Sequence, residues 1–344
     1  MRPSRALSLS RRGLLAAGGA VGLGALVTAC GDDKGSKSGG GSDSGKGGAW
    51  SFTDDRKKTV SLDGTPQRIV AYTPVAAALH DFGVDDQIVG VFGPTKLPNG
   101  KPDPMAGDLD VNRVKILGNE YDKFSVEEYV GLDPQLLISN MYDPGALFYV
   151  PEASKKKIFD LAPTLAISTA RVSMLEPIKR YAELAESLGA DLKAKKVTDA
   201  KARFEKASET LRKTAKSSRI RVMACSGNPD LFYVSNPKAN ADLIYFRELG
   251  VDFVVPEKLD ENGYFQSLSW ENADQYDADL LFLDNRTGTL QPKDLAAKPT
   301  WKQLPAVKAG QIAPWSSEPR FSYAGATPLI ESLTKAIQDA KKVR

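Results

Sequence analysis

Residues 190–217, ADLKAKKVTDAKARFEKASETLRKTAKS, decide the fold because they combine helical length with a single apolar stripe. The apolar positions recur mostly three or four residues apart: Leu192, Val197, Ala200, Phe204, Ala207, Leu211 and Ala215. This spacing predicts an amphipathic helix, and neither Gly nor Pro interrupts it. At 1.5 Å per residue, about 26 residues extend about 39 Å, long enough to run beside two lobes. A surface helix that belongs to one lobe is the alternative.

Short apolar runs alternate with helical patterns on both sides of this stretch. Before it, strands are predicted at 68–72, 86–92 and 134–139 and helices at 73–83 and 125–131. After it, strands are predicted at 219–224 and 279–284 and helices at 243–250 and 269–276. This alternation is typical of a parallel sheet covered by helices on both faces. We therefore predict an α/β protein with an N-terminal lobe at 50–189, a connecting helix at 190–217 and a C-terminal lobe at 218–344.

The N-terminal 29 residues have the pattern of an export signal. Positive residues precede an uncharged run at 14–27, which is too short and too rich in glycine for a membrane span. The pair Arg11 and Arg12 resembles a twin-arginine signal, which exports folded proteins. Residues 27–30, Val-Thr-Ala-Cys, resemble a bacterial lipobox, so Cys30 is the expected site of cleavage and lipid attachment. An ordinary cleaved secretory signal is the alternative.

Residues 30–49 are predicted to tether the folded part to that lipid. Positions 31–48 consist mainly of Gly and Ser and contain no apolar residue. A flexible chain of this length holds the folded part roughly 23 Å from the membrane. The segment therefore contributes reach and no core.

Charge and cysteine content exclude two classes of protein. Residues 1–29 hold four of the 46 basic residues and none of the 43 acidic residues, so the exported chain is close to neutral. A basic surface for nucleic acid is therefore not expected. With Cys30 acylated, Cys225 has no partner for a disulfide.

Four groups of residues carry a resemblance to a known family. They are 68–71 with 79–84, 125–129 with 132–138, YAELAESLG at 181–189, and TWKQLPAVKAG at 300–310. In this order they resemble the helical-backbone periplasmic binding proteins that serve as iron-siderophore and cobalamin receptors of ABC importers. The resemblance implies the class III fold, with two Rossmann-like lobes joined by a long backbone helix. It also implies a binding protein, not an enzyme.

Ferric-hydroxamate receptors are the members that the chain resembles most. The matching segments are SNMYDPG at 139–145, GYFQ at 263–266 and FSYAGAT at 321–327. The loop at 118–122 lacks the arginine with which some of these receptors hold the hydroxamate oxygens. Arg286 and Arg320 are the candidates to replace it.

A ferric siderophore brings its iron coordination already complete, so its receptor needs aromatic walls and hydrogen-bond donors and no metal ligands of its own. Ligands of open α/β sheets bind at the carboxyl ends of the strands. The candidate ligand contacts in such loops and in the matching segments are Tyr72, Tyr142, Tyr149, Tyr233, Phe265, Arg286, Trp315, Arg320, Phe321 and Tyr323. For each of them, packing within a loop or the core is the alternative role.

The number of candidate cations indicates the charge of the ligand. A ferric tris-catecholate carries three negative charges, whereas a ferric trihydroxamate is nearly neutral. Two candidate arginines among many aromatic residues favour a hydroxamate, of the linear or cyclic ferrioxamine type. No cofactor and no protein-bound metal are expected.

The resemblance also implies a permease as partner, docked by one exposed glutamate on each lobe. The matching positions are Glu127 and Glu271, with Glu128 as the neighbouring alternative on the first lobe. A carboxylate near a helix start also stabilises the helix dipole, which is the structural alternative. We expect a monomer, anchored through Cys30 to the extracytoplasmic face of the cell membrane of a Gram-positive bacterium.

Three other functions are alternatives to a siderophore receptor. A receptor of the same fold for haem or cobalamin has similar aromatic walls, and Tyr142 is a candidate axial ligand for haem. A zinc or manganese receptor needs several histidines, and the chain has only His80. An exported enzyme is disfavoured because the sequence has no G-x-S-x-G motif and no histidine near Cys225.

Overall fold

The computed structural model describes residues 48–286 and 288–343. The predicted signal, the lipobox with Cys30 and nearly all of the tether lie outside the described residues. Within the described ranges, no helix has both the length and the apolar character needed to cross a bilayer.

The N-terminal sheet has five strands in the order β5-β4-β3-β6-β7, and every neighbouring pair is parallel. The strands are β3 (Ile69–Tyr72), β4 (Ile88–Phe92), β5 (Lys115–Ile116), β6 (Leu136–Met141) and β7 (Thr164–Ser168). All residues of β3 and β6 are buried, as a central strand with helices on both faces requires. The strands predicted at 68–72, 86–92 and 134–139 are therefore confirmed, with ends shifted by up to two residues.

Local signals fix the helices of this region: α1 (Thr73–Phe82), α2 (Val126–Gly131), α3 (Lys155–Leu161) and α4 (Leu175–Ser187), with a 3₁₀ turn η1 (Pro104–Ala106). At the end of α1, Gly83 adopts a left-handed conformation with φ of 100° and donates to the carbonyl of His80. At the start of α2, the Ser125 hydroxyl accepts from the backbone N–H of Glu128 at 3.3 Å. The helices predicted at 73–83 and 125–131 are confirmed.

A hairpin that the sequence did not reveal precedes this sheet. Strands β1 (Trp50–Thr53) and β2 (Thr59–Leu62) pair antiparallel. The Trp50 indole donates to the backbone carbonyl of Ser187 at 3.0 Å. Asp54, buried in the turn, accepts from the backbone N–H of Ala166 at 3.1 Å. The hairpin is thus attached to α4 and β7, and β1 is the first element within the described residues.

The C-terminal sheet is mixed, with the order β11-β9-β8-β12-β13 and β10 pairing with β8. Its strands are β8 (Arg221–Gly227), β9 (Leu231–Ser235), β10 (Asp252–Phe253), β11 (Phe265–Ser269), β12 (Leu280–Asp284) and β13 (Ile312–Trp315). The pairs β8–β9 and β9–β11 are antiparallel, so the prediction of an entirely parallel sheet is wrong here. The reason is the short connection at 228–230, which closes a hairpin and leaves no room for a crossover helix.

Short helices cover this second sheet: α6 (Ala241–Glu248), α7 (Pro292–Leu295), α8 (Pro299–Gln303) and α9 (Pro305–Lys308). The helix predicted at 269–276 is wrong, because only a 3₁₀ turn, η2 (Trp270–Asn272), forms there. The buried Trp270 donates its indole N–H to the carbonyl of Asn228 at 3.1 Å and packs on the β8–β9 hairpin. This tertiary contact, together with the weak helix propensity of Asn and Asp, overrides the periodic pattern.

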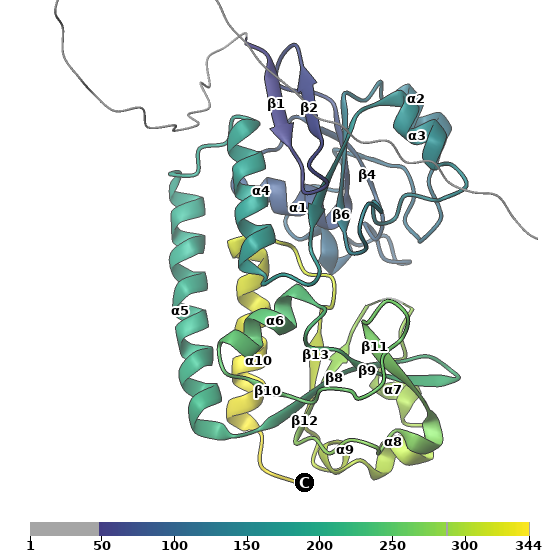
Figure 1. The fold of residues 1–344 in the computed structure, drawn as a ribbon, viewed down its shortest axis with the longest axis vertical. Coiled ribbons are helices and arrows are strands. Elements are labelled where there is room, and N and C mark those ends of the chain that lie inside the picture. Colours follow the sequence, from purple (N-terminus) through teal and green to yellow (C-terminus); the bar gives the residue numbers. More distant parts are fainter. Residues whose placement is uncertain (1–47, 287, 344) are drawn as a thin grey trace, which may run out of the picture. The chain divides into compact units, whose positions relative to one another are not determined.

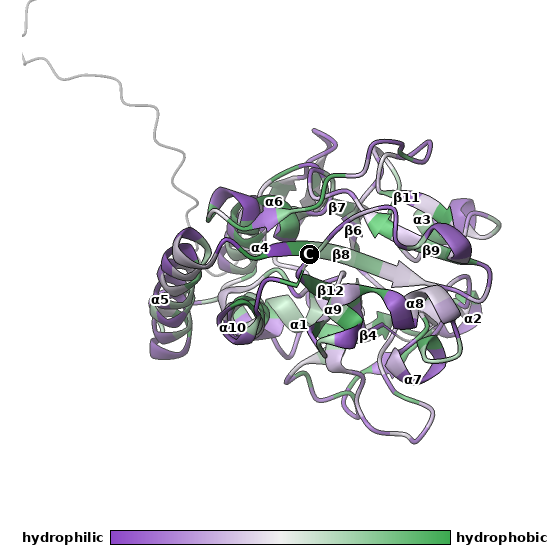
Figure 2. Cartoon of the chain, turned by 90° about the horizontal axis from the view of Figure 1, so that it is seen from below, coloured by the Kyte–Doolittle hydropathy of each residue, from purple (hydrophilic) through white to green (hydrophobic). Residues whose placement is uncertain are grey.

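Helix α5 (Lys195–Ser218) packs lengthwise against α10 (Tyr323–Asp339) (Figure 1). It begins five residues later than the predicted start at 190, because the Asp191 side chain accepts from the backbone N–H of Lys193 in a turn. Val197, Phe204, Ala207 and Leu211 are buried as predicted, while the outer surface of α5 is coloured hydrophilic in Figure 2.

Helix α5 contacts elements of both lobes. Its Lys196 ammonium donates to the carbonyl of His80 in α1 at 3.2 Å. Its Phe204 ring stacks on Tyr245 in α6, with ring centroids 5.7 Å apart. The alternative of a helix that belongs to one lobe is therefore excluded, and the predicted class of fold is confirmed.

Cys225 lies in β8, within a second hydrophobic cluster that includes Met223, Phe232, Trp270 and Trp301. Its side chain is completely buried. Burial raises the pKa of the thiol well above its usual value, so the thiolate, which is the reactive form, is suppressed.

Candidate ligand-binding site

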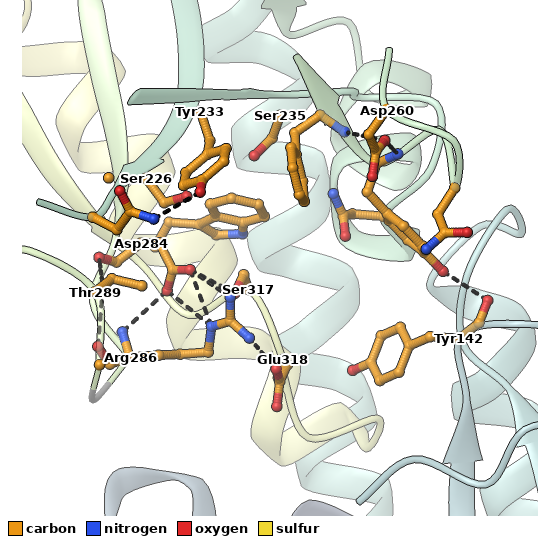
Figure 3. Close-up of a pocket in the computed structure, with 18 of the residues that line it drawn as sticks. Tyr142, Ser226, Tyr233, Ser235, Asp260, Asp284, Arg286, Thr289, Ser317 and Glu318 are labelled. Carbon is orange, nitrogen blue, oxygen red and sulfur yellow. Dashed lines mark hydrogen bonds and ion pairs between the residues drawn. The ribbon is translucent and has the colours of Figure 1, made fainter. Parts of the chain in front are cut away.

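A cavity of about 470 Å³ lies where loops from both sheets meet (Figure 3). Its volume is within the range that small-molecule sites occupy. The lining side chains come from four places in the fold. They follow β6 (Tyr142, Asp143, Phe148), belong to the β8–β9 hairpin (Ser226, Asn228, Tyr233), precede or begin β11 (Asp260, Tyr264, Phe265) or follow β12 and β13 (Arg286, Ser317, Glu318). Polar and aromatic residues that directly follow buried strands in the sequence, such as Tyr142 and Arg286, thus line this cavity.

Arg286 is the cation of the cavity, held between two carboxylates. Its Nε lies 3.0 Å and its Nη2 2.7 Å from Oδ2 of Asp284, the buried last residue of β12. Its Nη1 donates to Oε1 of Glu318. Burial opposes the charge on Arg286, but Glu318 and Asp284 outweigh it and raise the pKa of the guanidinium above its ordinary value. The group therefore stays charged.

This arrangement leaves Arg286 with unused donors. A guanidinium has five N–H groups. The bonds to Asp284 and Glu318 use one N–H on each of the three nitrogens, so two N–H groups have no partner within the described residues. The side chain lines the main cavity and the adjacent smaller one, so these two N–H groups are the donors that Arg286 can offer to a ligand oxygen.

Tyr142 offers a further polar group opposite Arg286. Its hydroxyl is buried and has no hydrogen-bond partner within the described part of the chain. Figure 3 shows the ring pointing across the cavity toward Glu318. Burial, followed by the negative charge of Glu318, raises the pKa of Tyr142 well above its ordinary value. The hydroxyl therefore keeps its proton and can donate it in a hydrogen bond.

The position of Tyr142 is fixed through its backbone. The Tyr142 carbonyl accepts from the hydroxyl of Tyr264 at 2.7 Å and from Nη1 of Arg171 at 2.9 Å. Its ring meets Phe148 edge to face at a centroid distance of 4.7 Å. The unpartnered hydroxyl is therefore carried by a well-held side chain.

Aromatic rings form the remaining walls. Tyr233 and Phe265 pack edge to face with centroids 4.8 Å apart, and the Tyr233 hydroxyl accepts from Asn228 at 2.8 Å. Trp315, also in the lining, stacks on Phe282 with centroids 5.8 Å apart. Flat apolar faces of this kind suit a bulky organic ligand.

Trp315 is held by a buried acid. Its indole N–H donates to Oδ2 of Asp242 at 2.6 Å. Complete burial raises the pKa of Asp242 to about 7, although the hydrogen bond from Trp315 favours the ionised form.

Because the pKa of Asp242 is raised in the native state, this residue is expected to lower the free energy of unfolding as pH rises. An unfolded aspartate releases its proton near pH 4, whereas Asp242 in the native state keeps it to about pH 7. Between these values the native state holds more protons, so the free energy of unfolding decreases as pH rises, by about 4 kcal/mol at most. Urea unfolding at pH 5 and pH 8 should show a smaller decrease for Asp242→Asn than for wild type. The exposed control Asp199→Asn should follow wild type, and equal decreases in all three proteins would contradict the assignment.

Five of the ten predicted contacts line the main cavity: Tyr142, Tyr233, Phe265, Arg286 and Trp315. Tyr149 lines an adjacent cavity of about 200 Å³, which shares Arg286 and Glu318 with the first. Tyr72 is fully buried. Its ring stacks on Tyr149 with centroids 5.1 Å apart, and its hydroxyl donates to Oε2 of Glu318 at 2.6 Å. Tyr72 therefore orients a cavity residue and does not itself line either cavity.

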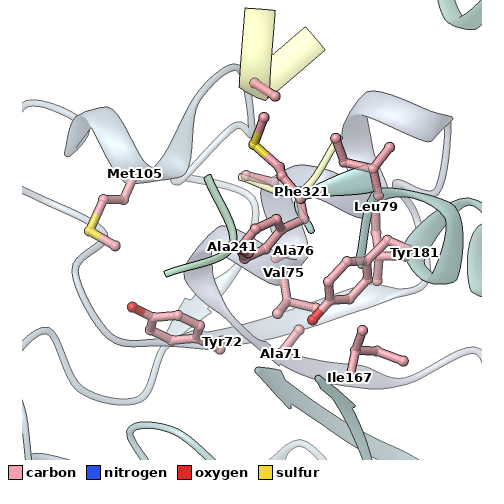
Figure 4. Packing of buried hydrophobic residues seen from close by; sticks show 14 of the residues in the cluster. Ala71, Tyr72, Val75, Ala76, Leu79, Met105, Ile167, Tyr181, Ala241 and Phe321 are labelled. Carbon is pink, nitrogen blue, oxygen red and sulfur yellow. The ribbon is translucent and has the colours of Figure 1, made fainter. Parts of the chain in front are cut away.

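The other three lie elsewhere. Arg320 pairs with Asp81 of α1 at 3.3 Å. Phe321 is buried in the hydrophobic core (Figure 4). Tyr323 begins α10, where its ring contacts Phe82 and Phe204.

Sequence reasoning missed Asp143, Asp260, Tyr264, Asp284 and Glu318 as lining residues. Tyr264 directly precedes Phe265, which was predicted, and Asp284 is the last residue of a predicted strand. Their positions in the sequence could therefore have identified both as lining residues. Nothing local distinguishes Asp260 from other surface acids. Among the described residues, no cluster of three or more His, Cys, Asp or Glu side chains could hold a metal ion.

The two predicted docking glutamates are at the surface. Glu127 is exposed in the first turn of α2, whereas its neighbour Glu128 is paired with Lys115 at 2.7 Å. Glu271 is exposed in η2, and its own backbone N–H and the Ser269 hydroxyl lower the pKa of its carboxyl below the usual value.

Two sheets, a long helix that contacts both lobes and a cavity at the strand ends define a solute-binding protein with a helical backbone. The pattern of the family described as "Periplasmic binding protein" matches residues 69–319, and the chain belongs to this family. It is accordingly an extracytoplasmic substrate-binding receptor and not an enzyme.

Known proteins that are similar to the chain include two binding proteins of Bacillus subtilis and a ferric-siderophore receptor of Streptomyces coelicolor. The crystal structure of DesE, a ferric-siderophore receptor protein from Streptomyces coelicolor, is 54% identical, covers 86% of this chain and 100% of its own, and superposes with a TM-score of 0.81. The Fe(3+)-citrate-binding protein YfmC of Bacillus subtilis (strain 168) is 24% identical over 263 residues, 75% of this chain and 76% of its own. The iron(3+)-hydroxamate-binding protein FhuD of the same organism is 25% identical over 208 residues, 58% of this chain and 60% of its own.

Proposed function

We propose that this receptor captures a ferric siderophore, most specifically a ferric trihydroxamate of the ferrioxamine type, and delivers it to an ABC importer. The observation that carries the proposal is the pairing of aromatic walls with Arg286, whose guanidinium has two unused N–H groups at the cavity. The similarity to a ferric-siderophore receptor and to a hydroxamate-binding protein supports it.

In the proposed complex, the organic shell of the chelate packs against Tyr233, Phe265 and Trp315. The unused N–H groups of Arg286 donate to hydroxamate oxygens, which carry partial negative charge. The Tyr142 hydroxyl, which lacks a partner, donates from the opposite side. The protein then needs no bond to iron, because the siderophore already fills the coordination sphere of the metal.

Haem is the nearest alternative ligand, and the environment of Tyr142 argues against it. An axial tyrosine binds ferric haem as the phenolate. The burial that raises the pKa of Tyr142, and the negative charge of Glu318 nearby, both oppose phenolate formation.

Titration of tryptophan fluorescence tests the proposal, since Trp315 lines the cavity. The purified protein is titrated with a ferric trihydroxamate, a ferric tris-catecholate, ferric citrate, haem and cobalamin. The hydroxamate should give saturable binding and the tightest affinity. Tighter binding of haem or cobalamin, or no response to any ferric chelate, would overturn the proposal.

Delivery to the permease is assigned to Glu127 and Glu271. Alanine at each position should lower siderophore-dependent iron uptake in cells by about tenfold or more, because each removes an interfacial ion pair. Siderophore affinity of the purified variants should stay unchanged, since both residues lie outside the cavity. Glu128→Ala is the matched control, because Glu128 already pairs with Lys115. Equal uptake by wild type and the Glu127→Ala and Glu271→Ala variants would refute this docking mode.

The proposal includes a lipid anchor at Cys30, on the extracytoplasmic face of the cell membrane of a Gram-positive bacterium. Residue 30 lies outside the described part of the chain, so the support comes from the lipobox pattern. Labelled palmitate should be incorporated into wild type and not into Cys30→Ala. Equal labelling of both proteins would exclude anchoring at this cysteine.

A further inference from the structure

The main cavity has an excess of negative charge. Among the residues that the structure describes, its lining contains four carboxylates, Asp143, Asp260, Asp284 and Glu318, and one cation, Arg286. Asp284 and Glu318 share that single cation, so this side of the cavity already carries more negative than positive charge. Arg286 therefore cannot compensate the other two carboxylates.

Asp143 and Asp260 differ in their nearest partners. Asp143 lies 3.7 Å from Nη2 of Arg171, and that guanidinium is also engaged by the carbonyls of Tyr142 and Asn262. Asp260 forms no ion pair with any described residue. Its Oδ1 accepts from the backbone N–H groups of Tyr264 at 2.7 Å and Phe265 at 3.2 Å, which fix the carboxylate in place.

Asp260 and Arg286 lie on opposite sides of the cavity, with the aromatic rings between them (Figure 3). A ligand that fills the cavity therefore meets hydrogen-bond donors at one end and an uncompensated carboxylate at the other. Asp260 is half-buried, and a carboxylate in a partly enclosed cavity attracts a cation and repels an anion more strongly than one at an open surface.

We propose that the cavity selects a ferric chelate with net positive charge, and that Asp260 pairs with a protonated amine on its organic shell. This inference rests on the proposed function and specifies which hydroxamates it favours. Arg286 and Tyr142 contact the iron-bound oxygens, while the amine extends to Asp260 on the other side. Anionic chelates such as ferric citrate and ferric tris-catecholates meet the surplus of carboxylates and bind poorly.

The test uses two chelates that differ in one charge. One is a linear ferrioxamine that ends in a primary amine, and the other is the same chelate with that amine acetylated. Dissociation constants are measured by tryptophan fluorescence at low and at physiological salt. The amine form should bind wild type about tenfold more tightly, which corresponds to one ion pair of about 1.4 kcal/mol, and the ratio should shrink as salt rises.

The matched variant is Asp260→Asn, which removes the charge and keeps an oxygen to accept from the two backbone N–H groups. The ratio of the two dissociation constants should fall to near one in this variant, and the ratio cancels any general effect of the substitution on the cavity. Asp277→Asn, at an exposed position outside the cavity, should keep the wild-type ratio.

The outcomes separate the two proposals. Equal binding of both chelates by wild type would overturn the charge selection and leave the hydroxamate function standing. A ratio that survives in Asp260→Asn and disappears in Asp143→Asn would overturn the assignment to Asp260. Failure of wild type to bind either chelate would overturn the proposed function itself.

Discussion

Arg286→Ala is expected to weaken binding of a ferric trihydroxamate by about a hundredfold or more. The substitution removes the two unused N–H groups of a side chain that lines the cavity. It also leaves Asp284 and Glu318, both almost completely buried, without their cation, and these carboxylates then repel the hydroxamate oxygens. Fluorescence titration gives the affinity, and circular dichroism checks that the variant is folded. An affinity within about threefold of wild type, too small a loss for a charge-assisted hydrogen bond, would contradict this role.

Two further variants separate lost donors from surplus negative charge. Arg286→Lys keeps the charge, but an ammonium lacks the planar guanidinium that can bond to two carboxylates and a ligand at once. Its affinity is therefore expected to lie between those of wild type and Arg286→Ala. The double variant Arg286→Ala/Glu318→Gln removes one cation and one anion. If the donors matter most, the double variant stays weak. Recovery toward wild type would show that charge balance alone explains the first result.

Phe204→Ala is expected to produce the largest loss of stability, about 3 to 5 kcal/mol in the free energy of unfolding. The Phe204 side chain is 2% exposed. Its ring centroid lies 5.7 Å from that of Tyr245 and 5.5 Å from that of Tyr323. Truncation therefore opens a void where α5 meets both α6 and α10. Urea unfolding at fixed pH measures the change.

The control for this prediction lies on the same helix. The Lys213 side chain is 77% exposed, so Lys213→Ala should change the free energy of unfolding by less than about 0.5 kcal/mol. Comparable losses in the two variants would mean that α5 is stabilised by its own helix propensity and not by the contacts of Phe204.

The sequence predicted the N-terminal sheet better than the C-terminal one for a physical reason. Strands β3 and β6 are buried on both faces and therefore appear as continuous apolar runs bounded by helix signals. Strands β9 and β11 have partly exposed positions and pair through a hairpin, so their pattern is weaker. The start of α5 was misplaced because a local turn at Asp191 interrupts a hydrophobic spacing that continues through it.

Site residues were predictable where they follow directly from a strand. Tyr142 and Arg286 come one and two residues after β6 and β12, and both line the cavity. Arg320 and Phe321 follow Glu318 closely in sequence, yet the chain turns away after Glu318. The reason is Ser322, whose hydroxyl caps α10 and donates to buried Asp81 at 2.5 Å, a contact between residues far apart in the chain. Asp260 was missed for a similar reason, because its place in the cavity depends on how its loop folds.

The burial of Cys225 has a consequence for a protein that works outside the cytoplasm. A completely enclosed thiol in its protonated form is out of reach of peroxides and of a sulfhydryl on another molecule. Within the described residues Cys225 is free, so this part of the chain reaches its native state without forming a disulfide. The folded receptor is therefore protected from sulfenylation and from covalent dimers through this residue.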